Sequence, residues 1–503
     1  MLGLWRTHQE YQDFLVGKFL PLYSTNKERL EYYATALAKL YLLDLDPLKP
    51  ILETLFSHTG KPAKNQPEIF RSFVLMSELR ESSITNWVKK LKSDALLCHM
   101  IGVAPDDVPE VGNHYDFINR LWLENPDIAN QRQNSLHPFK RKPTKKLGKN
   151  QKQPPRHPGI IQKLADFALQ GKTFESRPEI LMQQIFAKVI VEPSANQGLL
   201  GNTQKMAVSG DGTCINTGGS SYGIKVCDCV KNKVYNCDCQ RRFSDPQARH
   251  GWDSYHEQWF YGYTGYFLSV YNPDLQCDLP LYLRLVEAQR FDGVSAIVAL
   301  AEAKKLYPDF SFDSFFGDSA HDNYPTYQLL NAWHIKAFIP LNDKNKGHFK
   351  FPPPVKIDEN GVPICIAGFS MVYDSFLQDR CRIKWRCPLA TGKIDFCPCK
   401  EQCSPSSYGR TVYTKPKWDL RLFTAVPRGS DLWKQKMKNR TTSERVNKRI
   451  LVDYDLEKAR IRSKKRWSWR LLVHSANLHL DARLKVSGFC FIDLLDKLNS
   501  KSA

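Results

Sequence analysis

The sequence lacks any run of about 18 apolar residues, the length that a membrane-spanning helix needs. Its first residues, Met-Leu-Gly-Leu-Trp-Arg, also lack the basic and long apolar segments of a secretory signal peptide. We therefore expect a cytoplasmic protein with no membrane partner. Disulfides are rare in that compartment, so the 14 cysteines, which crowd largely into two short segments, indicate bound metal rather than cross-links.

Acidic residues are the second shortage. Asp and Glu number 52 against 72 Lys and Arg, which gives a formal net charge of +20. A basic excess of this size repels itself unless a polyanion neutralises it, so nucleic acid is the expected partner. A basic surface that meets only solvent is the alternative. The 42% hydrophobic and 12% aromatic content excludes a disordered chain, and 503 residues allow about two to four domains.

Acids and large apolar residues are almost absent from residues 137–159, where prolines alternate with lysines and arginines. Such a segment cannot build a core, so it predicts an extended linker between domains. A simple tether is one interpretation. The other is contact with DNA phosphates, which adds affinity without sequence preference. The basic residues predicted to make these contacts are Lys140, Arg141, Lys142, Lys145 and Lys146.

Residues 1–136 show apolar side chains at helical spacing, notably over 30–43, 69–79 and 84–100. We expect an N-terminal all-α domain. Helix pairs with a short polar turn, here at Ser82–Trp87, resemble helix-turn-helix modules and favour DNA binding. Any small helical bundle would give the same pattern.

The segment 206–213 carries the first candidate catalytic residue. Met206–Val208 predicts a short strand, which Asp211 follows between Gly210 and Gly212. Glycine on both sides would leave room for a large substrate, although Ser-Gly-Asp-Gly is also a common turn. Further strands are expected at 259–271, 279–288, 312–318 and 335–340, with helices at 293–307 and 324–333.

This order predicts an α/β fold with an RNase H-like mixed sheet flanked by helices. The first and fourth strands of such a sheet are neighbours, so Asp211 should face Asp318, which ends the fourth strand. Two close carboxylates repel each other unless a cation lies between them, and their hard oxygens suit Mg²⁺ or Mn²⁺. Asp322 is either an outer ligand or, as we favour, the cap of the following helix.

A basic helix after residue 430 offers the third carboxylate. Arg440, Glu444 and Lys448 recur every four residues and so share one face, with Thr442 or Ser443 as a cap. An exposed ladder of ion pairs would show the same spacing. With two strand-end aspartates upstream, however, Glu444 is the natural third ligand.

The chain resembles the DDE transposases of bacterial insertion sequences, of the cut-and-paste type with an interrupted RNase H-like domain. The resemblance covers roughly residues 160–485 and rests on Ser-Gly-Asp-Gly-Thr at 209–213, Phe-Gly-Asp-Ser-Ala-His-Asp at 316–322 and Arg-x-x-x-Glu-Arg-Val-Asn at 440–447. Asp211, Asp318 and Glu444 match the catalytic triad. Around the glutamate many members have Tyr-x-x-Arg-x-x-x-Glu-x6-Lys, whereas this chain has Met437 and Leu451 at the outer positions.

The resemblance implies DNA cleavage and strand transfer with two Mg²⁺ or Mn²⁺ ions per active site. Arg440, Arg445 and Lys448 are then expected to bind DNA phosphates. The implied partners are double-stranded DNA, as element ends and as target, and a second copy of the chain on that DNA. The implied location is the nucleoid of a prokaryotic cell. The alternatives are a DDE-type nuclease without strand transfer and an inactive DNA-binding relative that acts as a regulator.

Cysteine spacing predicts structural zinc sites. Cys227 and Cys239, like Cys229 and Cys237, lie symmetrically about Lys233, so an antiparallel hairpin turning there would bring four thiols to one face. The second set is Cys387, Cys397, Cys399 and Cys403. It falls in a proline-rich, β-rich insertion predicted at 346–428, between two parts of the catalytic core at 160–345 and 429–503. Whether the two sets form separate sites, share ligands or stay free is open.

Overall fold

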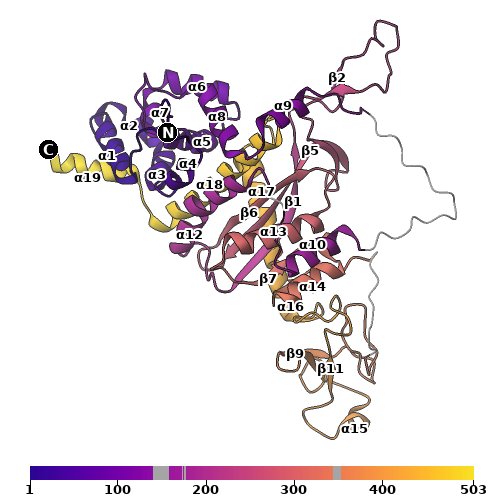
Figure 1. Cartoon of the computed structure of the whole chain (residues 1–503). Helices are drawn as coiled ribbons and strands as arrows, with labels where there is room; N and C mark the ends of the chain where they lie inside the picture. Colours follow the sequence, from indigo (N-terminus) through magenta and orange to yellow (C-terminus); the bar gives the residue numbers. More distant parts are fainter. Residues whose placement is uncertain (140–157, 173, 175–176, 344–352, 503) are drawn as a thin grey trace.

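The computed structural model describes residues 1–139, 158–172, 174, 177–343 and 353–502. The basic residues expected to follow DNA phosphates within the linker, Lys140 to Lys146, lie outside these ranges. The described part is a mixed α/β structure, with one large sheet between helical layers and a smaller β unit at one end (Figure 1).

The main sheet has six strands. Five of them follow the spatial order β6-β5-β1-β7-β8, and β4 extends the sheet alongside the other end of β5. β1 runs antiparallel to β5 and parallel to β7, so the predicted side-by-side placement of the first strand and the Asp318 strand is confirmed. The strands are β1 (Met206–Asn216), β4 (Arg249–Asp253), β5 (Gln258–Asn272), β6 (Cys277–Glu287), β7 (Phe312–Phe316) and β8 (Lys336–Phe338).

Helices cover both faces of this sheet. Side chains alternate between faces along a strand, and an added Cβ at Gly212 would meet helix α13 (Asp292–Leu306), whereas Ser209 bonds helix α17 (Thr441–Lys448). These two helices therefore lie on opposite faces of β1. Helices α10 (Ile160–Leu169) and α14 (Tyr324–Ala332) pack beside α13 through a shared apolar cluster.

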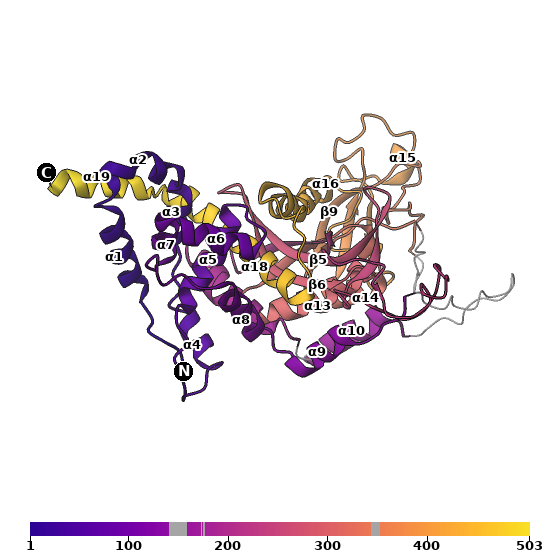
Figure 2. The same ribbon diagram turned by 90° about the horizontal axis from the view of Figure 1, so that it is seen from above.

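Helix α18 (Lys464–Ser487) joins the sheet to the N-terminal helices, as Figure 2 shows. Its His479 bonds the carbonyl of Pro280 on β6, while its Asn477 donates to the carbonyl of Val74 on α5. Both partners are buried, so α18 is enclosed on nearly all sides. One continuous apolar core consequently runs from the first helices through the sheet to the C-terminal helices.

The N-terminal region is all-helical, as predicted. Its elements are α1 (His8–Phe19), α2 (Tyr23–Tyr32), α3 (Ala34–Leu42), α4 (Leu48–Glu53), α5 (Gln66–Glu78), α6 (Ile84–Ser93), α7 (Ala95–Ile101), α8 (Val111–Leu121) and α9 (Pro126–Asn134). The single helix expected over 84–100 is two helices, because Asp94 leaves the helical conformation and caps α7 by accepting a bond from Leu96 N. Ser83, placed in a turn by the sequence, caps α6.

The remaining helices connect these parts. They are α11 (Ile180–Phe186) and α12 (Glu192–Asn196) before the sheet, and α16 (Asp431–Met437) and α19 (Phe491–Ser502) near the C-terminus. Short π-helical turns lie at Ala187–Val191 and Arg449–Asp453, and 3₁₀ turns at Ser319–His321 and Lys438–Arg440. Of the helices in the described ranges, none has both the length and the apolar character that crossing a bilayer requires.

Between β8 and α16 the chain forms the smaller β unit. Its sheet has the order β11-β10-β9, from strands β9 (Val372–Leu377), β10 (Arg382–Arg386) and β11 (Thr411–Thr414), with a single helical turn, α15 (Lys400–Cys403). Ile383, Trp385 and Val412 belong to its own apolar core. The predicted β-rich character of this segment agrees with these three strands. The unit projects away from the N-terminal helices (Figure 1).

Candidate active site and cysteine hairpin

Asp211 lies in the middle of β1 rather than after it. The strand predicted to end at Val208 continues to Asn216, and Asp211 pairs with Phe267 of β5. The expected role of the flanking glycines is also wrong. An added Cβ at Gly210 would lie 2.2 Å from Tyr266 Oη, and one at Gly212 would lie 2.5 Å from Asp292 Oδ1. The glycines thus make room for the protein's own side chains, not for substrate.

Asp292 is a fourth carboxylate near this site, and the sequence analysis did not single it out. It is the first residue of α13, entered from Phe291, and its carboxylate stands over Gly212 beside Asp211. Burial, followed by the charges of Asp292 and Asp318, raises the pKa of Asp211 to about 7. Glu444 also raises it. Three acidic side chains therefore lie close enough to Asp211 to raise its pKa.

Asp318 follows β7 and is held by a buried histidine. Its Oδ1 accepts a bond from Ala320 N at 3.0 Å and lies 2.6 Å from His321 Nδ1, while His321 Nε2 lies 2.9 Å from Tyr266 Oη. Burial alone would lower the pKa of His321, but the hydrogen bond and charge of Asp318 outweigh it and raise that pKa. Burial would likewise raise the pKa of Asp318, yet its bond to His321 keeps it low.

Glu444 reaches this site from α17. Ser209 Oγ on β1 lies 2.9 Å from Ser443 Oγ and donates to the carbonyl oxygen of Arg440 at 2.9 Å, which fixes the start of the helix on the strand. Ser443 is therefore a packing contact and not the predicted cap. Glu444 is partly exposed and forms an ion pair of 2.6 Å with Arg440.

The three predicted ligands converge without being in mutual contact. Within the described ranges, only the cysteines of the hairpin bring three or more potential ligand atoms within 4.8 Å of one another. Asn447, one turn beyond Ser443, adds a buried amide whose Nδ2 lies 3.5 Å from Asp211 Oδ2 and whose Oδ1 has no hydrogen-bond partner in the described structure. The motif Arg-Val-Asn contains this residue, but no spacing rule marks it as part of the site.

The predicted DNA contacts on α17 have different environments. Lys448 is exposed. Arg445 instead binds Asp278 of β6 through two contacts of 2.6 Å, so its guanidinium holds α17 against the sheet. Arg445 was predicted to bind a DNA phosphate. This pairing conflicts with that role, because the buried Asp278 carboxylate already binds its guanidinium.

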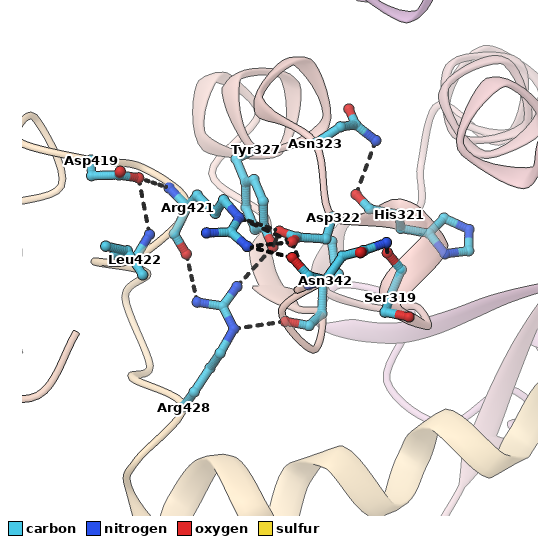
Figure 3. A network of polar contacts seen from close by, with 11 residues as sticks. Ser319, His321, Asp322, Asn323, Tyr327, Asn342, Asp419, Arg421, Leu422 and Arg428 are labelled. Carbon is cyan, nitrogen blue, oxygen red and sulfur yellow. Dashed lines mark hydrogen bonds and ion pairs between the residues drawn. The ribbon is translucent and has the colours of Figure 1, made fainter. Parts of the chain in front are cut away.

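Asp322 neither caps α14 nor faces the candidate site. Asn323 is the cap, with its side chain accepting a bond from Thr326 N. Asp322 is 1% exposed and binds Arg421 of the insertion at 2.8 Å. Tyr327 Oη and the backbone nitrogen of Asn342 also donate to it, as Figure 3 shows. This network ties the end of the insertion to the turn that carries Asp318.

The cysteine hairpin is confirmed in outline and corrected in detail. Strands β2 (Ile224–Lys225) and β3 (Arg241–Arg242) form its base, and Lys233 at the predicted turn has a φ of 60°. Between them the chain forms turns rather than the expected ladder. The closest thiol pairs are consequently Cys227 with Cys237 and Cys229 with Cys239, each at 3.6 Å.

All four hairpin thiols lie within 4.8 Å of one another, so the group can bind a structural metal such as zinc. The backbone N–H of Cys239 lowers the pKa of Cys237 to about 7, whereas the neighbouring thiols raise the pKa of Cys229, so Cys237 is the thiol that most favours the thiolate form that metals bind. The second predicted set, Cys387, Cys397, Cys399 and Cys403, is not drawn together to this distance and instead lines a cavity.

A scan against models of known protein families and a search of curated proteins gave no match for this chain.

Proposed function

We propose that the chain is a DNA transposase of the DDE type, which cleaves DNA at the ends of a mobile element and joins those ends to target DNA. One observation carries this proposal. Asp211 and Asp318 come from adjacent parallel strands, Glu444 comes from a helix anchored on the first of those strands, and both partners influence the pKa of Asp211.

The sheet supports an RNase H-like core. Three antiparallel strands, β6, β5 and β1, are followed across the sheet by the parallel strands β7 and β8. Crossover helices α13 and α14 precede β7 and β8 in the chain. The insertion falls between β8 and the Glu444 helix, which is the interruption that the resemblance to DDE transposases implies.

The donor set fits hard divalent cations. The buried Asp211, whose pKa the neighbouring carboxylates raise, gains most when a cation neutralises it, and oxygen ligands select Mg²⁺ or Mn²⁺. Such ions would polarise a phosphodiester and make a bound water acidic. Asp211, Asp318 and Glu444 would hold them, and the nearby charge of Asp292 would add to the attraction for a cation.

The neighbouring side chains orient these ligands. His321 and Ala320 N bind Oδ1 of Asp318, so Oδ2 would be the oxygen that holds a metal, and Tyr266 contacts the far nitrogen of His321. Asn447 restrains Asp211 through the contact of its Nδ2 with Asp211 Oδ2. Glu444 is paired with Arg440, and if it held a metal instead, the Arg440 guanidinium would be available to a DNA phosphate.

Cleavage of labelled duplex DNA tests the proposal. The probe carries candidate inverted repeats taken from the DNA beside the coding region, and the reaction contains Mg²⁺ and a target plasmid. Cleaved ends together with joined product support the transposase. Cleavage alone would indicate a nuclease, and a shifted but intact duplex would indicate a DNA-binding regulator.

A further inference from the structure

The insertion contains a long segment with no apolar anchor. Between Leu389 and Arg410 no side chain is fully buried, and the only regular structure is the single turn α15. The apolar core of the unit lies on the sheet side, around Ile383 and Trp385. Loops of this length in compact domains are uncommon, and a small unit with so little core usually needs a metal or a cross-link.

Five thiols from three separate stretches line one cavity of about 650 Å³ in this region. Cys365 comes from a tight turn closed by its backbone bond to Phe369, and Cys387 directly follows β10. The other three come from the loop around α15. The full set is Cys365, Cys387, Cys397, Cys399 and Cys403.

The two ends of the unanchored segment meet at Cys387. An added Cβ at Gly409 would lie 2.6 Å from Cys387 Cβ, so only glycine permits this approach. Burial raises the pKa of Cys403, the Arg410 guanidinium lowers it, and the neighbouring Cys387 and Cys365 raise it. These three thiols therefore lie within electrostatic reach of one another, with a cation beside them.

We propose that this cavity is a second structural zinc site, in which Cys365 and Cys387 bind from the sheet side and Cys403 with one of Cys397 and Cys399 binds from the α15 loop. Cys365 is absent from the set that spacing alone suggested. Each ligating thiol gives a proton to solvent as its sulfur binds zinc, and Arg410 offsets part of the resulting negative charge. The proposal does not depend on the transposase function.

The thiols surround the cavity rather than touching, so the loop must move inward to give Zn–S bonds of about 2.3 Å. Little in the segment 389–410 resists this, because none of its side chains is buried in the core and its ion pair between Lys393 and Asp431 is exposed. The hairpin at 227–239 differs, since its four thiols are already within 4.8 Å.

Zinc content of the full chain, purified under reducing conditions, tests the proposal. We expect about two zinc ions per chain, one in each site. In a background of Cys227→Ser with Cys237→Ser, about one should remain, and adding Cys365→Ser or Cys403→Ser should remove it. Cys381→Ser is the matched control, because Cys381 belongs to the same unit but is exposed and does not line the cavity.

Cobalt substitution in the hairpin-deficient background gives a readout that misfolding cannot mimic. A tetrathiolate site gives intense thiolate-to-cobalt absorption, and Cys397→Ser and Cys399→Ser should differ, with one losing the spectrum and the other keeping it. Trypsin cleavage after Lys393 and Lys400 should become faster when a chelator removes the metal. No zinc in the Cys227→Ser, Cys237→Ser background, iron in place of zinc there, or full zinc retention when Cys365→Ser is added would overturn the proposal.

Discussion

The carboxylate site and the cysteine hairpin gather similar numbers of potential ligands in opposite ways. The carboxylates stand on strands and helices of the main core, and buried contacts from Ser209, His321 and Tyr266 position them. The hairpin thiols lie within 4.8 Å of one another on a projecting loop with almost no regular structure. The first site is built by the fold, so it should persist without metal. The second has little else to hold its shape, so metal should decide its structure.

The largest effect should follow from replacing Asp211. If it holds the metal that activates the phosphodiester, Asp211→Asn should reduce DNA cleavage by about 10³-fold or more, because such metal contacts supply several kcal/mol of transition-state stabilisation. DNA binding in a gel-shift assay should be unchanged. Asp309→Asn, at an exposed position, is the control. Normal cleavage by the Asp211→Asn variant would show that the carboxylate site does not catalyse the reaction.

Arg421→Ala should be the most destabilising change among those outside the site. It leaves Asp322 charged and buried, which costs about 3–5 kcal/mol in the free energy of unfolding. Urea unfolding of the variant and the wild type measures this loss of free energy. The control is Lys393→Ala, which breaks an exposed pair with Asp431 of 2.8 Å and should cost less than about 1 kcal/mol. Equal costs would contradict the distinction between the buried network and the projecting parts.

Stability in the absence of metal should depend on pH through Asp211. Burial raises its folded-state pKa to about 7, so the folded protein binds this proton more tightly than the unfolded chain does. The resulting stabilisation is fully present at low pH and is lost as pH rises from about 4 to about 7. Thermal melts of chelator-treated protein should therefore show a fall over this window. Asp211→Asn should lack that part of the fall, and Mg²⁺ should oppose it.

A smaller effect is expected at Gly212. Its added methyl group in Gly212→Ala would displace the Asp292 carboxylate, now 2.5 Å from that position, at a cost of about 1–3 kcal/mol shared between stability and activity. The rate of DNA cleavage measures the loss of activity, and the melting temperature measures the loss of stability. Gly112→Ala in α8 meets no atom within 4 Å and should be neutral or slightly stabilising. Unchanged DNA cleavage by the Gly212→Ala variant would show that Asp292 has no part in the site.

Loss of the hairpin metal should have the smallest effect on the core. Cys227→Ser with Cys239→Ser should make trypsin cleavage after the exposed Lys231 and Lys233 faster, because the loop loses its order. It should change the unfolding free energy of the rest by no more than about 0.5 kcal/mol, because the loop packs little apolar surface. Limited proteolysis reports on the loop, and thermal melts of the same sample report on the stability of the rest of the chain. Cooperative loss of the whole fold would contradict a local role for this metal.

Sequence order was sufficient to predict the pairing of the Asp211 and Asp318 strands. It also gave the helical N-terminal region and the hairpin turn at Lys233. These features follow from local periodicity, residue spacing and the limited topologies of a mixed sheet, all of which can be read along the chain.

Only the tertiary structure revealed Asp292 over Gly212, Asn447 beside Asp211 and Arg421 on Asp322. Each joins segments that no periodicity relates, and each depends on how helices and loops distant in the chain pack around the sheet. A carboxylate at a helix start looks like an ordinary cap in sequence. Its proximity to another buried charge is a property of packing alone, which is why the acidic site appears larger in three dimensions than in the sequence.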